Sequence, residues 1–223
     1  MIIGIAGKAR SGKDQFADYL VEVFEKVHDK FFMKAAFATS LKYMCMESFD
    51  LSPSQVYRDK KEVPDLRYPK DGVGVSSNPS DYWTPREIMQ ALGSFYRSID
   101  YDFWVKQTDK EIKSLSSRVD EDGFRISGFI ITDVRHVNEC EYVKKNGILI
   151  KVIRPDADEI HGMDHESETA LDNKPADYFD ITVENSGTLK DLLETAHEVA
   201  GAAIAMNAIR NQGRVVENEW RNS

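Results

Sequence analysis

The chain has 223 residues, which is long enough for one well-packed core and too short for two full-sized domains with separate functions. Its formal net charge of −9 argues against binding to a nucleic-acid polymer through the overall field, although a nucleotide pocket needs only a few local cations. No stretch approaches the ~18 apolar residues of a membrane span, no signal peptide is recognisable, and the cysteines Cys45 and Cys140 form no disulfide framework, so the cytoplasm is the expected compartment.

The amino-terminal part of the chain alternates strand and helix. Residues 1–6 form an apolar run that stops at Gly7, which predicts a short buried strand. Residues 13–28 carry apolar side chains three and four positions apart, the pattern of an amphipathic helix: Phe16, Leu20, Val23, Phe24 and Val27. A second short strand is predicted over residues 35–38, followed by a helix that begins near Ser40.

The middle of the chain differs in composition. Residues 63–83 are rich in proline, glycine and serine, which indicates a long loop of the kind that is usually functional in a compact domain. Thr84 and Pro85 are typical of a helix start, and the helix that they begin is expected to run to about Ile99. Another helix is predicted over residues 102–117.

The carboxyl-terminal half predicts a parallel sheet. Strands over residues 126–132 and 148–153 flank a helix over residues 136–145, and strand, helix, strand at this spacing is a βαβ unit. A last strand is predicted over residues 180–183, followed by a helix over 188–201 that could continue through the alanines. The expected fold is therefore a three-layer α/β domain over residues 1–223, with excursions at 50–120 and 155–178.

A phosphate loop follows the first strand. Residues 7–14 fit the pattern G-x-x-x-x-G-K, with a strand before it and an amphipathic helix after it. Backbone amides and the helix dipole would hold phosphate there, and Lys13 would reach the β- and γ-phosphates. Asp14 stands where Ser or Thr is usual, either as a Mg²⁺ ligand or as an acid that stabilises the helix dipole. The expected nucleotide-binding residues are Gly7, Lys8, Arg10, Ser11, Gly12, Lys13 and Asp14.

A second group of candidate residues follows the strand at 126–132. In open α/β sheets ligands bind at the carboxyl ends of the strands, where Asp133 and Arg135 are expected. Asp133 could bind Mg²⁺ or orient the acceptor, and Arg135 could hold a phosphate with two hydrogen bonds. A helix start is the structural alternative, with Asp133 as the N-cap and Glu139 on a solvated face; it suits Glu139 and leaves Arg135 unexplained.

Candidate acceptor residues lie on the helix that begins at Thr84. Arg86, Gln90 and Gly93 share one face by their i, i+4, i+7 spacing, which is compatible either with a solvated stripe or with a cleft. Lys42, after the second predicted strand, could supply a further phosphate-binding cation. His161 and His165 have the spacing of metal ligands on a helix, but Gly162 lies between them in a predicted loop, so a zinc site is not expected.

Several of these segments together resemble the phage-type deoxynucleoside monophosphate kinases, which are P-loop kinases of the nucleoside monophosphate kinase superfamily. The resemblance spans nearly the whole chain and rests on these segments: Gly7–Asp14, Phe37–Lys42, Thr84–Gly93 with Phe95–Arg97 and Asp102–Trp104, Thr132–Glu139 and His165–Thr169. The phosphate loop is generic, whereas the segment with Arg86, Gln90 and Gly93, taken with Trp104, is more specific. The resemblance implies a three-layer P-loop kinase fold, ATP with Mg²⁺ as the donor and a deoxynucleoside monophosphate as the acceptor.

The resemblance also implies roles for particular residues. Arg86, Gln90, Trp104 and Arg135 would lie near the acceptor. Arg154 would be a lid arginine, with residues 155–178 as the lid, and Asn185 would border the donor base. The catalytic set is then Lys13, Asp133, Arg135 and Arg154, with Asp14 and Asp133 as the candidate metal ligands.

Two alternatives stay open at the level of sequence. Animal phosphomevalonate kinases resemble the chain in the phosphate loop, the Asp-x-Arg strand end and the stretch with Ser167, Glu168 and Leu171–Asn173. The chain could also be a regulatory module that binds nucleotide without transferring phosphate, although three arginines beside a phosphate loop are typical of transfer. The sequence leaves the oligomeric state open, a homodimer included, and indicates neither a membrane nor a polymer partner.

Overall fold

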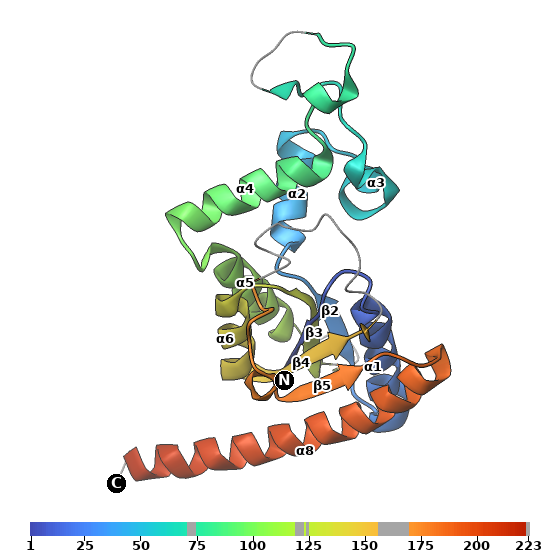
Figure 1. The fold of residues 1–223 in the computed structure, drawn as a ribbon. Helices are drawn as coiled ribbons and strands as arrows, with labels where there is room; N and C mark the ends of the chain where they lie inside the picture. Colours follow the sequence, from blue (N-terminus) through green and yellow to red (C-terminus); the bar gives the residue numbers. More distant parts are fainter. Residues whose placement is uncertain (71–74, 119–122, 124, 156–169, 222–223) are drawn as a thin grey trace. The chain divides into compact units, whose positions relative to one another are not determined.

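The computed structural model describes residues 1–70, 75–118, 123, 125–155 and 170–221, with side chains described as far as residue 212. The chain forms two compact units (Figure 1). The first unit consists of Met1–Ala36 and Asp109–Ser223, and the second consists of Phe37–Thr108. The second unit overlaps the helical excursion that the sequence predicts over residues 50–120.

The first unit is built on a five-stranded parallel sheet. Its strands are β1 (Ile2–Ala6), β2 (Phe32–Ala35), β3 (Gly128–Val134), β4 (Gly147–Ile153) and β5 (Ile181–Glu184), in the spatial order β2-β3-β1-β4-β5. β1 lies in the centre, because Ile2–Ala6 is buried on both faces. All carboxyl ends therefore meet at one edge of the sheet, where a ligand is expected.

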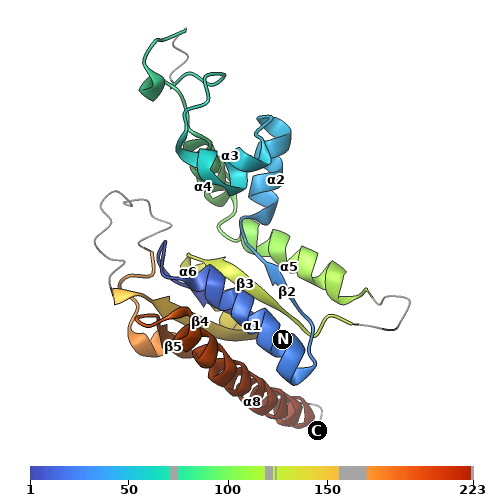
Figure 2. The ribbon, with the colours of Figure 1, turned by 90° about the vertical axis from the view of Figure 1, so that its right-hand side faces the viewer.

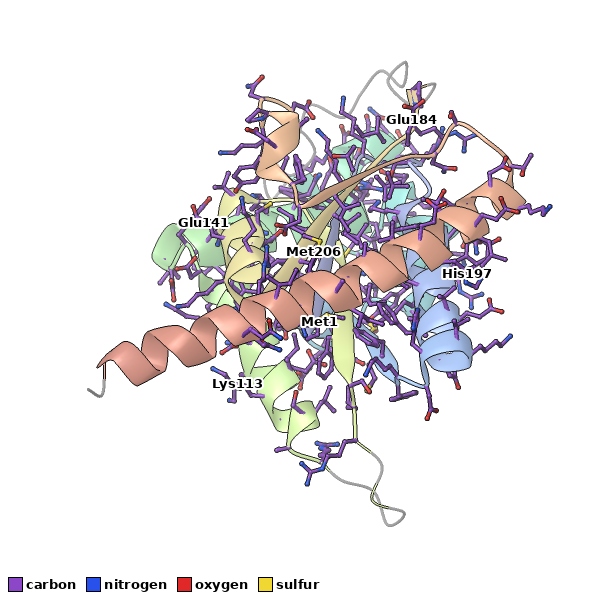
Figure 3. The ribbon with its side chains drawn as sticks, turned by 90° about the horizontal axis from the view of Figure 1, so that it is seen from below. Met1, Lys113, Glu141, Glu184, His197 and Met206 are labelled. Atoms are coloured by element: carbon purple, nitrogen blue, oxygen red, sulfur yellow. The ribbon has the colours of Figure 1, made fainter. Side chains whose placement is uncertain are left out.

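Helices cover both faces of this sheet (Figure 2). On one face, α1 (Lys13–His28) packs beside α8 (Leu189–Arg221), which is longer than the predicted helix and continues through the alanines. Figure 3, which is seen from below, shows α8 running across this face, where Met1 and Met206 pack against the core. On the other face lies α6 (Val137–Asn146), whose Tyr142 hydroxyl donates to Asp109 of α5 (Phe103–Ser116). The predicted three-layer α/β fold is confirmed.

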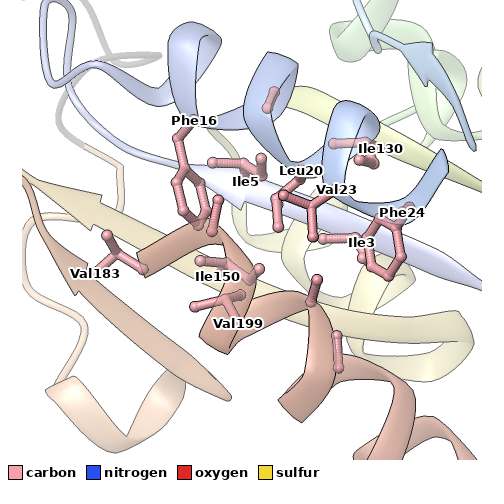
Figure 4. Packing of buried hydrophobic residues seen from close by; sticks show 14 of the residues in the cluster. Ile3, Ile5, Phe16, Leu20, Val23, Phe24, Ile130, Ile150, Val183 and Val199 are labelled. Carbon is pink, nitrogen blue, oxygen red and sulfur yellow. The ribbon is translucent and has the colours of Figure 1, made fainter. Parts of the chain in front are cut away.

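The core between α1, α8 and the sheet explains why α1 forms where the sequence predicts it (Figure 4). Phe16, Leu20, Val23 and Phe24 point from α1 onto β-strand residues and onto Val199 of α8. Val27, the fifth apolar residue of the predicted face, is 56% exposed because it lies in the last turn of α1, outside this core. Four buried side chains of this size contribute about 1.5–3 kcal/mol each, which is enough to fix the helix on the sheet.

The second strand lies three residues before the predicted segment. β2 covers Phe32–Ala35, and the predicted strand over residues 35–38 was wrong except at Ala35. The deciding contact is Phe32, which stacks on Phe24 of α1 with ring centroids 4.1 Å apart. An aromatic anchor therefore sets the register of β2, and residues 36–38 form the connection from β2 to α2, with the second unit beginning at Phe37.

The second unit is helical. It contains α2 (Thr39–Ser48), α3 (Pro53–Tyr57), α4 (Pro85–Ile99), the first residues of α5 and short 3-10 helices at Asp59–Glu62 and Pro79–Asp81. α4 begins as predicted, since Thr84 caps it in a reciprocal pair of hydrogen bonds with Glu87, and Pro85 occupies the first turn. A small core holds this unit together: Leu41, Cys45, Leu51, Val56, Ile88 and Trp104.

Candidate active site

The phosphate loop joins β1 to α1 and has the backbone that its glycines allow. Gly12 has φ +87° and directly precedes α1, and Arg10 also lies in the left-handed region, with φ +63°. A Cβ atom on Gly7 would lie 2.7 Å from the carbonyl oxygen of Val152, so β4 closes the start of the loop. The backbone amides at the start of α1 and the helix dipole make this loop a site for phosphate oxygens.

Lys13 is the first residue of α1 and is only 8% exposed. Burial lowers the pKa of its ammonium group; the Asp14 carboxylate opposes that shift, the Arg135 guanidinium adds to it, and the Asp133 carboxylate again opposes it. The direction of these effects shows that the two acids and Arg135 lie close enough to Lys13 to act on its charge. The structure thus brings together four of the predicted site residues: Lys13, Asp14, Asp133 and Arg135.

Asn185 supports the phosphate loop from the far end of the chain. Its side-chain amide donates to the carbonyl oxygen of Ser11 at 2.9 Å, and its backbone N–H donates to Ile153 at 2.7 Å. A side chain on Gly12 would collide with the Asn185 amide nitrogen. Asn185 therefore ties the turn after β5 to the loop, a positioning contact that the sequence did not reveal; its place beside a donor base stays a prediction.

The segment after β3 is held by Glu139. The Glu139 carboxylate accepts hydrogen bonds from the backbone N–H of Arg135 at 2.7 Å and of His136 at 3.0 Å. Glu139 is 2% exposed, so the predicted solvated position was wrong, and the N-cap of α6 is His136 rather than Asp133. The reason is the reciprocal capping pair, which draws the third helical residue back over the strand end. Glu139 thereby fixes the backbone from which Arg135 extends.

A cavity of about 340 Å³ opens beside the first half of the loop. Its walls come from the carboxyl ends of β1, β3 and β4 and from residues 171–179. Four basic side chains line it, together with the buried hydroxyl of Ser11 and with Asp172: Lys8, Arg135, Lys151 and Arg154. Asp172 lies 3.7 Å from Lys8. Its volume is that of a small-molecule site, and its four basic side chains suit a ligand that carries phosphate.

The remaining predicted acceptor residues lie in the second unit. Arg86 and Gln90 extend from the same face of α4, and the Nε of Arg86 pairs with the carboxylate of Glu62. Lys42 of α2 lies 4.8 Å above the ring of Tyr57. Trp104 is 2% exposed and donates its indole N–H to the Gly93 carbonyl at 3.1 Å, so it packs α5 on α4, and any influence on an acceptor would pass through α4.

A second cavity, of about 440 Å³, lies within this unit. It is lined by Phe49, Arg67, Tyr68, Pro69 and Trp83 and by four residues of α4, which are Ile88, Ala91, Leu92 and Phe95. At 100° per residue these four positions face away from Arg86 and Gln90. One acceptor molecule therefore cannot occupy this cavity and contact that face of α4 at once.

Some predicted features lie outside the described residues. Most of the expected lid, including His161, His165 and the stretch from His165 to Thr169, falls in residues 156–169. Within the part of the chain that the structure describes, no group of three or more His, Cys, Asp or Glu side chains could hold a metal ion. In the same part, no helix is long and apolar enough to cross a membrane.

Comparison with known proteins identifies the family. A model of the deoxynucleotide monophosphate kinase family matches residues 32–196, which is more than half of the chain. The chain belongs to this family. The predicted family and the predicted class of enzyme, an ATP-dependent phosphotransferase of the nucleoside monophosphate kinase type, are confirmed. Because the match begins after residue 31, the phosphate loop at Gly7–Asp14 is identified by its own sequence and geometry.

Two viral relatives of this kinase family are similar over nearly their whole length. A protein of Acanthamoeba polyphaga mimivirus, assigned as a deoxynucleotide monophosphate kinase, is 28% identical over 223 residues, which cover 93% of this chain and 100% of that protein. The deoxynucleotide monophosphate kinase of Escherichia phage RB69 is 24% identical over 251 residues, which cover 89% of this chain and 98% of that enzyme.

Among solved structures, the shikimate kinase of Aquifex aeolicus is similar over 92% of this chain and 99% of that chain, with 12% identity and a TM-score of 0.38.

Proposed function

We propose that this kinase transfers the γ-phosphoryl group of ATP to a deoxynucleoside monophosphate, giving ADP and a deoxynucleoside diphosphate. The observation that carries the proposal is the convergence at one sheet edge of the phosphate loop, the buried Lys13 and a cavity lined by arginines and lysines. The family match adds the acceptor class, and it favours neither a phosphomevalonate-kinase-like enzyme nor a non-catalytic module.

The transfer that we propose requires the two substrates to be positioned and the charge on the phosphoryl group to be stabilised, and it requires no nucleophilic side chain. An oxygen of the acceptor phosphate attacks the γ-phosphorus, and the bond between that phosphorus and the β,γ-bridging oxygen breaks as ADP leaves. The attacking phosphate is already largely ionised near neutral pH, so no general base is needed. Lys13 and Arg135 would stabilise the charge on the moving phosphoryl group, and Arg154, at the rim of the cavity, would neutralise the leaving phosphate.

Mg²⁺ is part of the proposal because the acids around Lys13 suit it. Mg²⁺ usually takes one or two carboxylates together with phosphate oxygens, and both Asp14 and Asp133 act on the charge of Lys13. When bound, the ion would neutralise charge on the donor phosphates. We expect Asp14→Asn or Asp133→Asn to raise the Mg²⁺ concentration needed for half-maximal rate several-fold. Mg²⁺ titrations that coincide for both variants and the unaltered enzyme would remove these residues as ligands.

The acceptor side of the proposal uses the second unit. Arg86 would bind the phosphate of the deoxynucleoside monophosphate, with Gln90 and Lys42 as further polar contacts, because the donor phosphates already have the loop and Lys13. We further propose a cytoplasmic enzyme, which is supported by two free, buried cysteines.

One assay tests the function as a whole. ADP formation is followed with ATP and, in turn, dAMP, dCMP, dGMP, dTMP and mevalonate phosphate as the acceptor. At least one deoxynucleotide should support turnover that Lys13→Ala abolishes. Turnover with mevalonate phosphate alone would show that the chain is a phosphomevalonate-kinase-like enzyme. Binding of ATP without formation of ADP in the presence of any acceptor would show that it is a non-catalytic nucleotide-binding module.

A further inference from the structure

Lys151 is a basic residue that neither the phosphate-loop motif nor the family resemblance singled out. It lies on β4, where it pairs in register with Ala6, the last residue of β1 before the phosphate loop. Its side chain lines the same cavity as Gly7, Lys8, Arg135 and Arg154. The strand thus directs a lysine at the first turn of the loop.

In the part of the chain that the structure describes, Lys151 contacts an aromatic ring and forms no ion pair. Its Nζ lies 4.9 Å above the ring of the buried Phe179, a contact that holds the head group without consuming its N–H donors. No hydrogen bond joins Lys151 to another described residue, although Asp172 lines the same cavity and pairs with Lys8. A half-buried ammonium group without a counter-charge is unfavourable unless a ligand supplies the negative charge.

A second group in the same cavity also lacks a partner. The hydroxyl of Ser11 is buried, with the residue only 1% exposed, and it makes no hydrogen bond to any described residue. A buried hydroxyl of this kind costs about 1–3 kcal/mol when it is unsatisfied. An ammonium group and a hydroxyl that face one cavity, both unsatisfied, form a site for an oxyanion.

We propose that Lys151 contacts a phosphate group in the transfer site and is a further catalytic residue of this kinase. The inference rests on the proposed function, since the phosphate belongs to one of the two nucleotides. The cavity is lined by Gly7, Lys8 and Ser11 but not by Lys13 or Asp14, so it lies away from the start of α1. Its proposed occupant is a phosphate group of the donor or of the acceptor.

A matched lysine elsewhere in the same unit provides the control. Lys144 of α6 also lies above an aromatic ring, at 4.3 Å from that of Tyr178, but it does not line the cavity. Replacing either lysine by methionine removes one charge and one ring contact and keeps an apolar chain of similar length. A merely structural role of Lys151 would make the two variants alike, whereas a role in phosphate binding would separate them.

The experiment measures steady-state kinetics with ATP and the best deoxynucleotide acceptor varied in turn. We expect Lys151→Met to lower kcat/KM at least tenfold, Lys151→Arg to keep most of it, and Lys144→Met to stay within twofold of the unaltered enzyme. A rise in the acceptor KM assigns the contact to the acceptor phosphate, a rise in the ATP KM assigns it to the donor, and a fall in kcat alone assigns it to the moving phosphoryl group.

Two further measurements make the result decisive. Lys151→Met should also lose the thermal stabilisation that inorganic tripolyphosphate gives the unaltered protein, and Lys151→Gln replaces it if the methionine variant does not fold. The inference is overturned if Lys151→Met and Lys144→Met lose equal activity, or if neither loses more than twofold while Lys13→Ala is inactive. An active Lys13→Ala would instead overturn the proposed function.

Discussion

The two units present positive charge in different ways. In the first unit Lys13 is buried at a helix start, and Arg135 extends from a strand end whose backbone is pinned by Glu139. In the second unit Arg86 lies on the surface of α4, 40% exposed and paired with Glu62. The proposed donor residues are therefore preorganised by backbone contacts and burial, whereas the proposed acceptor residue Arg86 has a long, partly exposed side chain that a ligand would have to recruit.

The largest expected loss of activity follows from replacing Lys13, the buried cation of the first unit. Lys13→Ala should lower kcat at least a hundredfold, because it removes a preorganised cation worth several kcal/mol in the transition state. Its melting temperature should hold, since burial of the Lys13 charge is unfavourable and its removal costs the fold little. Lys26→Ala, an exposed lysine of the same helix, is the control and should be fully active. A Lys13→Ala enzyme with more than about a tenth of normal kcat would contradict the assignment of the loop.

In the second unit, replacement of the partly exposed Arg86 by lysine should weaken binding of the acceptor and leave binding of the donor unchanged. A lysine cannot reproduce the two parallel hydrogen bonds of a guanidinium to phosphate, so we expect the acceptor KM to rise about tenfold and kcat to fall. The donor KM serves as the internal control and should hardly move. Lys106→Met, which breaks another ion pair of the second unit, checks that loss of any surface pair does not have this effect. A rise in the donor KM instead would move Arg86 to the donor site.

Substitutions of Glu139 test whether this carboxylate fixes the backbone of Arg135 at the end of β3. Glu139→Gln keeps an acceptor for the amides of Arg135 and His136 but loses the charge-assisted bonds, so kcat should fall about three- to tenfold with little change in stability. Glu139→Ala leaves two buried amides unsatisfied and should also destabilise the fold by about 2 kcal/mol. Glu141→Gln, which is exposed on the same helix, should do neither. Equal kinetics for Glu139→Gln and Glu141→Gln would show that Arg135 needs no such support.

The sequence predicted the features that depend on neighbouring residues and missed those that depend on distant ones. The loop at Gly7–Lys13 has fixed spacing, so local pattern sufficed, and the capping pair of Thr84 and Glu87 is likewise local. Contacts between distant positions could not be predicted from the sequence: the Asn185 side-chain amide donates a hydrogen bond to the carbonyl of Ser11, 174 residues away in the chain. Lys151 became a site residue only once the register of β4 against β1 was known.

The charge of a residue did not predict its burial at Glu139. Glu139 stands in a run of polar residues that is usually solvated, and only the reciprocal cap with His136 buries it. The β2 strand was misplaced for a different reason: Phe32 stacks on Phe24 of α1, a contact between distant positions that the apolar run at 35–38 does not reveal.

The smallest expected effect on catalysis concerns a buried acid in the second unit. Asp65 accepts hydrogen bonds from the Arg67 side chain at 2.7 and 2.9 Å, from the Arg67 backbone at 3.1 Å and from Gln55 at 2.8 Å. The Arg67 side chain holds the pKa of Asp65 at about 2, below its ordinary 3.8. The lowered pKa means that the ionised form stabilises the fold at neutral pH, by about 2 kcal/mol, and that this contribution disappears as the pH falls from about 4 toward 2.

Asp65→Asn should therefore lower the free energy of unfolding in urea by about 2 kcal/mol at pH 7, and its difference from the unaltered protein should narrow below pH 4. Its kcat should stay within about twofold, because the network holds the connection between α3 and α4 and touches neither Arg86 nor Gln90. Asp50→Asn is the matched control: Asp50 binds the same arginine at 3.0 Å, but its side chain is almost fully exposed, so its loss should cost little. If the two variants were equally stable, Arg67 would be held by packing on Tyr68, and the second unit would lack the buried polar anchor that Glu139 provides in the first.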